Sequence, residues 1–484
     1  MASAARQRPR LSLELDMPRR FLPLARRAAT AVALSALTVS GLMAVSGSEQ
    51  ATDAAAPLAA KARKANVVTP GDFTGFGFDQ CQAPSQAKMN RWLRTSPFWA
   101  VGIYIAGDSR ACRNQTYLNA TWVSTQLAKG WRLLPITLGP QASCQPRFPR
   151  YKDDFRISSK ANDNGLYAVA LRQGRTQAAE SVTAAIDLGI TTGSTLWYDL
   201  EGFDSNNAKC RESALAFLSG WTEQLHALGY VSGVYSSAGS GIRALDDARV
   251  TRPTAFTLPD QIWIARWDGI ASTSTPYIRA DGWMPRSRVK QYRGGHDETW
   301  GKVTINIDSN FLNLGQGSVA SPEVHCGGVV IPRAGYQVIR PANGTSTPNP
   351  VQVKALQCLL QEDGTYAGRI HGRYNGATAA AANAWQSAHG LPVTPGWTRN
   401  DWTALLSAGN RVLLKFGSAG PDVRRVQRAL SAAGTDATAA AVRATGVFNW
   451  KTDRALRAYQ QRIGVPVNGI AGGPTWAALQ GGKI

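Results

Sequence analysis

The chain has 484 residues, of which 44% are hydrophobic and 18% are charged, values typical of a globular protein and not of a disordered one. This length accommodates two or three domains with cores of their own. The formal net charge of +21 favours a polyanionic partner, such as nucleic acid, an anionic membrane or an anionic cell wall. Lysine and arginine are scattered and no nucleic-acid-binding motif is present, so we expect no nucleic-acid partner.

The N-terminal region has the layout of a secretory signal. Several arginines precede an apolar run over residues 28–45, and small residues follow it. We expect a signal peptide within residues 1–56, with Met17 as an alternative start, and a linker over residues 57–70. Paired arginines leave a twin-arginine export route open, and an uncleaved membrane anchor is the competing interpretation. No second stretch of the sequence could span a membrane, so we expect a secreted protein without stable membrane insertion.

Six cysteines, an even number without a C-x-x-C pair, agree with an oxidising compartment. The first four each follow an apolar, strand-like run, so they could pair across loops at one end of a single fold. We expect the pairs Cys81–Cys112, Cys144–Cys210 and Cys326–Cys358, although spacing alone leaves other pairings open.

Apolar strand-like runs alternate with helical stretches over residues 71–315. We expect eight strands, over residues 76–79, 100–106, 131–138, 196–201, 231–235, 262–267, 289–292 and 303–307. Helices are expected over residues 84–93, 117–128, 165–188 and 211–228, with short or degenerate helices between the last three strands. This alternation predicts an α/β fold, a (β/α)8 TIM barrel. A doubly wound open sheet is the alternative, but the first strand ends in Asp79-Gln80-Cys81, which cannot form the Gly-rich phosphate loop often found there.

Acidic side chains gather at the predicted strand ends, where barrel enzymes place their chemistry. Asp199 and Glu201 close the fourth strand and, being two positions apart, share one face of it with Trp197. Asp79 closes the first strand and Asp308 the eighth. Other polar and aromatic residues near strand ends are candidate substrate-binding groups: Trp197, Tyr235, Trp263, Arg266, Trp267 and Gln291.

Two acids beside an indole suit the acid-assisted cleavage of a glycosidic bond. We hypothesise that Glu201 is the general acid, with a pKa raised by burial beside Trp197 and by nearby like charges. Asp199 is then the nucleophile, a stabiliser of the transition state, or the group that orients an attacking N-acetyl group of the sugar. Asp79 and Asp308 tune the charge and hold sugar hydroxyls. Spacing along the strand does not set the distance between the carboxylates, so retention and inversion both stay open.

The C-terminal part contains an internal repeat. The segment Gly372-Arg373-Tyr374-Asn375 recurs 74 residues later as Gly446-Val447-Phe448-Asn449, and Trp402 recurs as Trp476 at the same shift. A linker rich in Gly, Ser, Pro and Thr covers residues 316–348. We therefore expect two small all-α domains, over residues 349–407 and 411–482.

The repeats resemble the small peptidoglycan-binding domain, whose pattern runs LQ, G-x-[FY]-[GN], [FYW]-Q and TW in that order. The second copy fits this pattern well, whereas the first has Pro395 where the second has Gly469 and Asp401 where the second has Thr475. Residues 75–313 resemble the glycoside-hydrolase-like domain family that was long a domain of unknown function, through segments that include Gly77-Phe78-Asp79 and Trp197-Tyr198-Asp199-Leu200-Glu201. More distantly they are similar to the family 25 lysozymes, whose strand ends carry D, D-x-E and D-x-N. The last of these is Asp308-Ser309-Asn310 here. The resemblance implies a barrel fold and a muramidase-like activity on peptidoglycan.

Two other classes of function remain to be weighed. A non-catalytic wall-binding protein with a degenerate barrel stays open, because a fold does not imply an activity. A zinc amidase or peptidase is disfavoured, since the five histidines form no H-E-x-x-H motif, and no G-x-S-x-G motif indicates a serine hydrolase. We therefore expect a monomeric, wall-associated hydrolase of peptidoglycan glycan strands that needs no metal or other cofactor.

Overall fold

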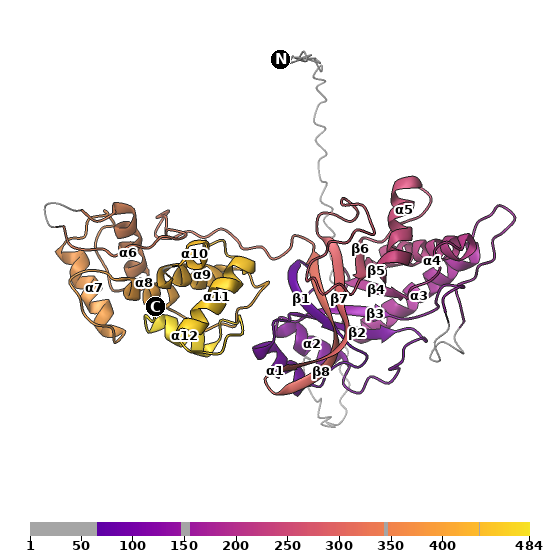
Figure 1. Ribbon diagram of the computed structural model, residues 1–484, viewed down its shortest axis with the longest axis horizontal. Helices are drawn as coiled ribbons and strands as arrows, with labels where there is room; N and C mark the ends of the chain where they lie inside the picture. The colour runs from indigo at the N-terminus through magenta and orange to yellow at the C-terminus, as the bar shows by residue number, and fades with distance from the viewer. Residues whose placement is uncertain (1–64, 147–154, 343–346, 435) are drawn as a thin grey trace, which may run out of the picture. The chain divides into compact units, whose positions relative to one another are not determined.

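The computed structural model describes residues 65–146, 155–342, 347–434 and 436–484 (Figure 1). The expected signal peptide and residues 57–64 of the linker after it lie outside the described residues. Within these ranges, no helix combines the length and the apolar character needed to cross a membrane.

Eight strands close into a barrel in the order β1 to β8. Neighbouring strands from β1 to β7 pair in parallel. The strands are β1 (Phe73–Asp79), β2 (Ala100–Ala106), β3 (Arg132–Thr137), β4 (Thr195–Leu200), β5 (Val231–Ser237), β6 (Gln261–Ala265), β7 (Ser287–Trp300) and β8 (Val303–Leu314). The closed eight-stranded barrel agrees with the predicted architecture.

The last strand departs from the prediction of a (β/α)8 TIM barrel, because β8 is antiparallel to both β7 and β1. Gly301 and Lys302 alone connect β7 to β8, and both have positive φ angles, of 57° and 67°. A parallel pair of strands needs a crossover connection of about a dozen residues. A two-residue turn can therefore join only antiparallel strands. The barrel is therefore mixed. The second half of β7 is polar and partly exposed. The predicted range, which followed the apolar run, therefore ended too early in the strand.

Helices follow several of the strands: α1 (Gln86–Thr95), α2 (Ala120–Ala128), α3 (Ala168–Asp187), α4 (Ala208–Ala227) and α5 (Arg243–Thr251), with a single π-helical turn, η2 (Ala238–Ile242), before α5. Helices α3 and α4 flank β4 along the chain and cross at very close range. A Cβ atom on Gly174 would lie 1.9 Å from the Phe217 carbonyl oxygen, and one on Gly220 would lie 2.0 Å from the Leu171 carbonyl oxygen. Glycine at both positions therefore allows the two backbones to touch.

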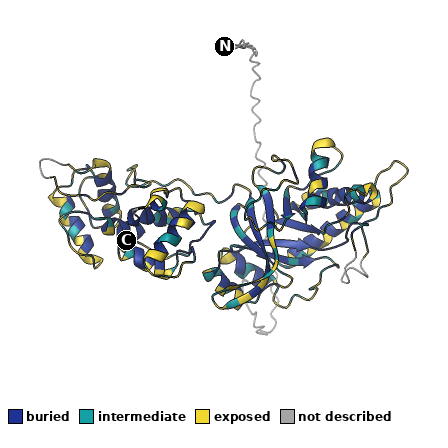
Figure 2. Cartoon of the chain, viewed as in Figure 1, coloured by how far each residue is buried: buried dark blue, intermediate teal, exposed yellow. Residues whose placement is uncertain are grey.

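Strand β4 is buried on both faces (Figure 2). Tyr198 and Leu200 belong to the core between the sheet and the helices, whereas Trp197 belongs to the core inside the barrel. The Trp197 ring meets Trp263 edge to face at a centroid distance of 5.5 Å. Gly233 leaves room for it, because a Cβ there would lie 2.4 Å from the Trp197 ring. The alternation predicted for this strand is confirmed.

All three predicted disulfides are confirmed. Cys81–Cys112, Cys144–Cys210 and Cys326–Cys358 join positions whose Cα atoms lie 5.6, 5.8 and 5.9 Å apart. The first bond joins two loops of the barrel, the second joins the loop after β3 to the start of α4, and the third joins the linker to the first repeat.

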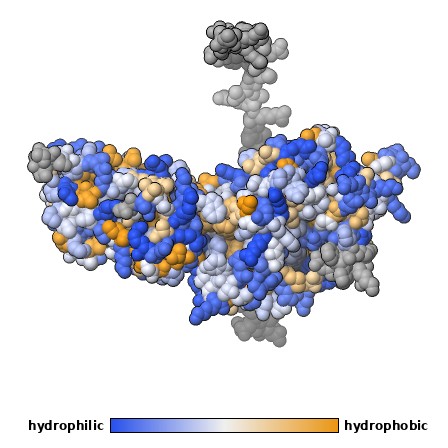
Figure 3. Space-filling model, viewed as in Figure 1, coloured by the Kyte–Doolittle hydropathy of each residue, from blue (hydrophilic) through white to orange (hydrophobic). Residues whose placement is uncertain are grey.

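The C-terminal region is helical. Its first unit contains α6 (Pro350–Glu362), α7 (Gly376–Ala388) and α8 (Arg399–Ser407), and its second contains α9 (Pro421–Ala433), α10 (Ala437–Ala440), α11 (Trp450–Arg462) and α12 (Gly473–Gln480). In Figure 3 apolar residues form scattered groups on a mainly hydrophilic surface.

Each of the two units contains the same buried network of polar side chains. In the first, Gln357 accepts a hydrogen bond from the Gly372 amide and donates one to Thr378 Oγ1, at 2.9 Å each. In the second, Gln427 makes the same bonds to Gly446 and Thr452, at 2.9 and 2.8 Å. Because buried polar groups need partners, these repeated glutamines hold the loop of each unit in place.

Candidate active site

Asp79 lies at the end of β1, directly opposite Asp308 on β8. Its side chain is only 3% exposed. Asn310 Nδ2 donates a hydrogen bond to Asp79 Oδ2 at 2.6 Å, and Gln291 Nε2 donates to the same oxygen at 3.2 Å. The antiparallel ladder therefore brings Asp308 beside Asp79 from the middle of its strand, and not from a strand end as predicted.

Asp79 and Asp308 share a hydrogen bond. Burial raises the pKa of Asp79 well above its usual range, and the charge of Asp308 raises it further, although the hydrogen bonds from Asn310 and Gln291 oppose this. Two carboxylates in contact cannot easily both ionise. The pKa of Asp308 is raised by burial as well, but Asp79 is the more deeply buried of the two, so we expect the pair to hold one proton mainly on Asp79.

The raised pKa of Asp79 makes stability depend on pH. An unfolded aspartate has a pKa of about 3.9, so the folded state binds this proton more tightly than the unfolded state. Its contribution to stability is complete below about pH 3.9 and is lost as the pH rises through the raised folded value. We expect the free energy of unfolding of wild type to fall relative to that of Asp79→Asn, which cannot titrate, as the pH rises from about 4 through the raised pKa of Asp79.

Urea denaturation of both proteins at several pH values measures this difference. Asp187→Asn is the matched control, because Asp187 is an exposed carboxylate on α3. Parallel pH profiles for wild type and Asp79→Asn would contradict a protonated Asp79.

Asp199 and Glu201 are held at the end of β4 by neighbouring strands. Tyr104 on β2 donates its hydroxyl hydrogen to Asp199 Oδ2 at 3.2 Å. Gln141, after β3, donates to the Asp199 carbonyl at 2.9 Å and accepts from the Glu201 amide at 2.8 Å. Burial and the negative charge of Asp199 raise the pKa of Tyr104 well above its usual range, so it stays a donor. Asp199 is buried, whereas Glu201 is partly exposed.

A cavity of about 280 Å³ opens beside Glu201. Two predicted binding residues line it with Glu201, namely Tyr235 and Trp267, and Trp267 is 68% exposed. Tyr235 Oη and Trp267 Nε1 both donate to Gln291 Oε1, at 3.0 and 2.8 Å. Because Gln291 in turn donates to Asp79, a continuous set of hydrogen bonds joins the cavity wall to the carboxylate pair.

The other predicted binding residues lie elsewhere. Trp197 and Trp263 are 0% and 1% exposed, because each lies inside its strand and not at the strand end. Trp263 Nε1 donates to Asn310 Oδ1 at 2.8 Å and so orients the amide that contacts Asp79. Arg266 pairs with Asp268 at 3.3 Å and lies over the Tyr277 ring. The structure therefore places the indoles of Trp197 and Trp263 beneath the site, where they support it.

Sequence analysis did not predict Tyr104 or Gln141 as site residues. Tyr104 lies inside an apolar strand and Gln141 in a loop, so neither had a motif of its own. Their roles follow from the neighbouring positions of β2, β3 and β4 in the sheet.

Two family models match the chain. Residues 91–312 match the model described as an Rv2525c-like, glycoside hydrolase-like domain. Over these residues the barrel is similar to this glycoside hydrolase-like family. Residues 349–405 and 419–479 each match the model of a peptidoglycan binding domain, which agrees with the two repeats recognised in the sequence.

Solved structures resemble part of the chain. The Tat-secreted protein Rv2525c of Mycobacterium tuberculosis, in complex with L-tartrate, is 14% identical over 50% of this chain and 98% of its own, with a TM-score of 0.32. The modular autolysin LytC of Streptococcus pneumoniae is 12% identical over 51% of this chain and 52% of its own, with a TM-score of 0.30. The modular Cpl-1 endolysin, complexed with a peptidoglycan analogue, is 14% identical over 56% of this chain and 61% of its own, with a TM-score of 0.28. Likeness at this level carries no argument about activity.

No curated protein matches the chain in sequence. Among the described residues, Cys326, Cys358 and Glu362 come close enough together to suggest a metal site. The two sulfur atoms are joined in a disulfide, so they are not free to act as thiolate ligands.

Proposed function

We propose that the protein is a secreted, muramidase-like glycoside hydrolase that cleaves the glycan strands of peptidoglycan. The observation that carries the proposal is the position of Glu201. It lines an open cavity at the end of β4, with the buried Asp199 two residues before it and the proton-sharing pair Asp79–Asp308 contributed by β1 and β8.

In this proposal Glu201 is the general acid that protonates the leaving glycosidic oxygen. Gln141 fixes its backbone through the Glu201 amide, so the carboxyl group is presented from a rigid strand end. Asp199, held by Tyr104, is the partner carboxylate, either as nucleophile or as the group that orients the N-acetyl group of the substrate. Trp267 offers an exposed indole face to a sugar ring, and the protonated Asp79 limits the negative charge beneath the cavity.

The two repeats hold the enzyme on its substrate. Their match to peptidoglycan binding domains supports this role, and the net charge of +21 adds a general attraction to anionic wall polymers. Salt screens interactions between exposed charges, so wall binding should weaken at high ionic strength.

Incubation of the full chain with purified sacculi tests the proposal. We expect co-sedimentation with the sacculi together with a steady release of new reducing ends. Co-sedimentation without any release would instead support the alternative, a non-catalytic peptidoglycan-binding protein with a degenerate hydrolase barrel.

A further inference from the structure

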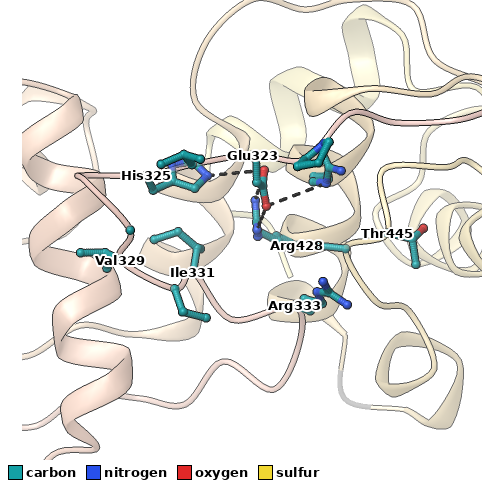
Figure 4. A pocket seen from close by; sticks show the side chains of 13 residues that line it. Glu323, His325, Val329, Ile331, Arg333, Arg428 and Thr445 are labelled. Atoms are coloured by element: carbon teal, nitrogen blue, oxygen red, sulfur yellow. Dashed lines mark hydrogen bonds and ion pairs between the residues drawn. The ribbon is translucent and has the colours of Figure 1, made fainter. Parts of the chain in front are cut away.

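A second cavity, of about 420 Å³, contains none of the residues of the carboxylate site (Figure 4). Nine of its lining residues come from the linker segment 322–333, which lies outside both stretches matched by the peptidoglycan binding model. Helix α9 contributes Arg424 and Arg428, and the segment after α10 contributes Ala444 and Thr445. The cavity is thus formed by the linker of this chain together with the second repeat.

Basic groups surround one carboxylate in this cavity. Arg428 donates hydrogen bonds to both carboxylate oxygens of Glu323. The bond from Arg428 Nη1 to Glu323 Oε2 is 3.2 Å long. His325 Nε2 lies 3.4 Å from Glu323 Oε2, and Arg424 Nε lies 3.9 Å from Oε1. Figure 4 shows Glu323 between the His325 ring and the arginine side chains. A carboxylate of the chain itself therefore occupies part of an arginine-lined site.

The cavity keeps an excess of positive charge. Burial raises the pKa of Glu323, but the hydrogen bonds and the charge of Arg428 outweigh this and hold it below its usual range. Arg424 and Arg428 are only 8% and 5% exposed, and Arg333 adds an exposed guanidinium to the lining. Three arginines and one ionised glutamate thus line the cavity, which leaves two positive charges in excess. A guanidinium binds planar carboxylates and phosphates through paired hydrogen bonds.

The linker wall of the cavity is fixed to the first repeat. The Cys326–Cys358 disulfide joins segment 322–333 to α6, and His325 Nδ1 lies 2.9 Å from Glu362 Oε2 on the same helix. A ligand therefore meets a site whose shape is already set, which reduces the entropic cost of binding.

We propose that this cavity binds an anionic group of the cell wall, a peptide carboxylate or a phosphodiester, on Arg333 and the guanidinium groups of α9, in competition with Glu323. The choice of the wall as the source of the ligand rests on the proposed function. The anion preference itself rests on the charges and geometry of the cavity.

Calorimetric titration of the full chain tests this with three probes: N-acetyl-D-alanine, its uncharged amide N-acetyl-D-alaninamide, and glycerophosphoglycerol, a phosphodiester of two glycerol molecules. We expect at least one of the two anions to bind and the amide not to bind. Arg333→Gln should weaken binding about fivefold, because it removes one exposed charge. Glu323→Gln should tighten binding about tenfold, because it removes the competing carboxylate.

Arg369→Gln is the matched control, since Arg369 is exposed and lies outside the cavity. The Tm of each variant shows whether it folds. If Glu323→Gln is unstable, Arg333→Gln still tests the proposal, because Arg333 is at the surface and its replacement should not disturb folding. Binding of N-acetyl-D-alanine alone assigns a peptide carboxylate, and binding of glycerophosphoglycerol alone assigns a phosphodiester. Absence of binding for both anions, or equal binding by wild type and Arg333→Gln, would overturn the proposal. Release of reducing ends from sacculi is scored separately, so failure of this site and failure of the proposed hydrolysis are distinguishable.

Discussion

Glu201→Gln should lower the rate of reducing-end release from sacculi by about 10²–10⁴-fold, the usual contribution of a general acid. Glutamine keeps the size of the side chain and a hydrogen-bonding oxygen, but it cannot deliver a proton to the leaving group. The Gln141 contact that holds this position uses the backbone amide of residue 201, so the substitution leaves it in place. Initial rates on purified sacculi measure the effect.

A matched carboxylate controls for the change in charge. Glu180 is exposed on α3, so Glu180→Gln should retain the wild-type rate. Thermal denaturation and co-sedimentation with sacculi should be the same for Glu201→Gln and wild type. If Glu201→Gln releases reducing ends as fast as wild type does, the assigned role is wrong.

Gly220→Ala should destabilise the barrel by about 3 kcal/mol, at the upper end of the range for overpacking. The added methyl group would lie 2.0 Å from the Leu171 carbonyl oxygen on α3, and a backbone atom cannot move aside as a flexible side chain can. Helices α3 and α4 would have to separate, and β4 lies between them in the chain. For a domain of this size the expected fall in Tm is roughly 6–12 °C.

Gly376→Ala is the control for this substitution, because Gly376 lies in α7 and a Cβ there would meet nothing within 4 Å. Alanine at that position should be neutral or stabilise the protein slightly. Calorimetric unfolding of the two variants compares them directly. A Tm for Gly220→Ala equal to that of wild type would show that α3 and α4 do not make this close contact.

Much of the fold could be predicted from the sequence because strand positions follow apolar runs. Strand β4 is apolar and aromatic apart from Thr195 and Asp199, and the long helices α3 and α4 lie within a few residues of their predicted ranges. The antiparallel direction of β8 could not be predicted from apolar runs. It depends on the turn at Gly301 and Lys302, whose two residues leave no room for a parallel crossover.

The acidic residues of the site were accessible to sequence analysis because each lies close to a motif on its strand. The groups that organise them were not. Tyr104 contacts Asp199 from β2, two strands away in the closed sheet, and Gln141 contacts it from the loop after β3, the strand that pairs with β4. Trp197 was predicted beside the acids and does share their strand face, yet it lies one step deeper, where the ring packs against Trp263.

The central claim is that the barrel cleaves glycan strands. Mass spectrometry of the soluble products after incubation of wild type with purified sacculi tests it most directly. We predict disaccharide muropeptides with a free reducing end, absent from a parallel incubation with Glu201→Gln. Sacculi that bind the protein and yield no new soluble muropeptides would contradict the claim.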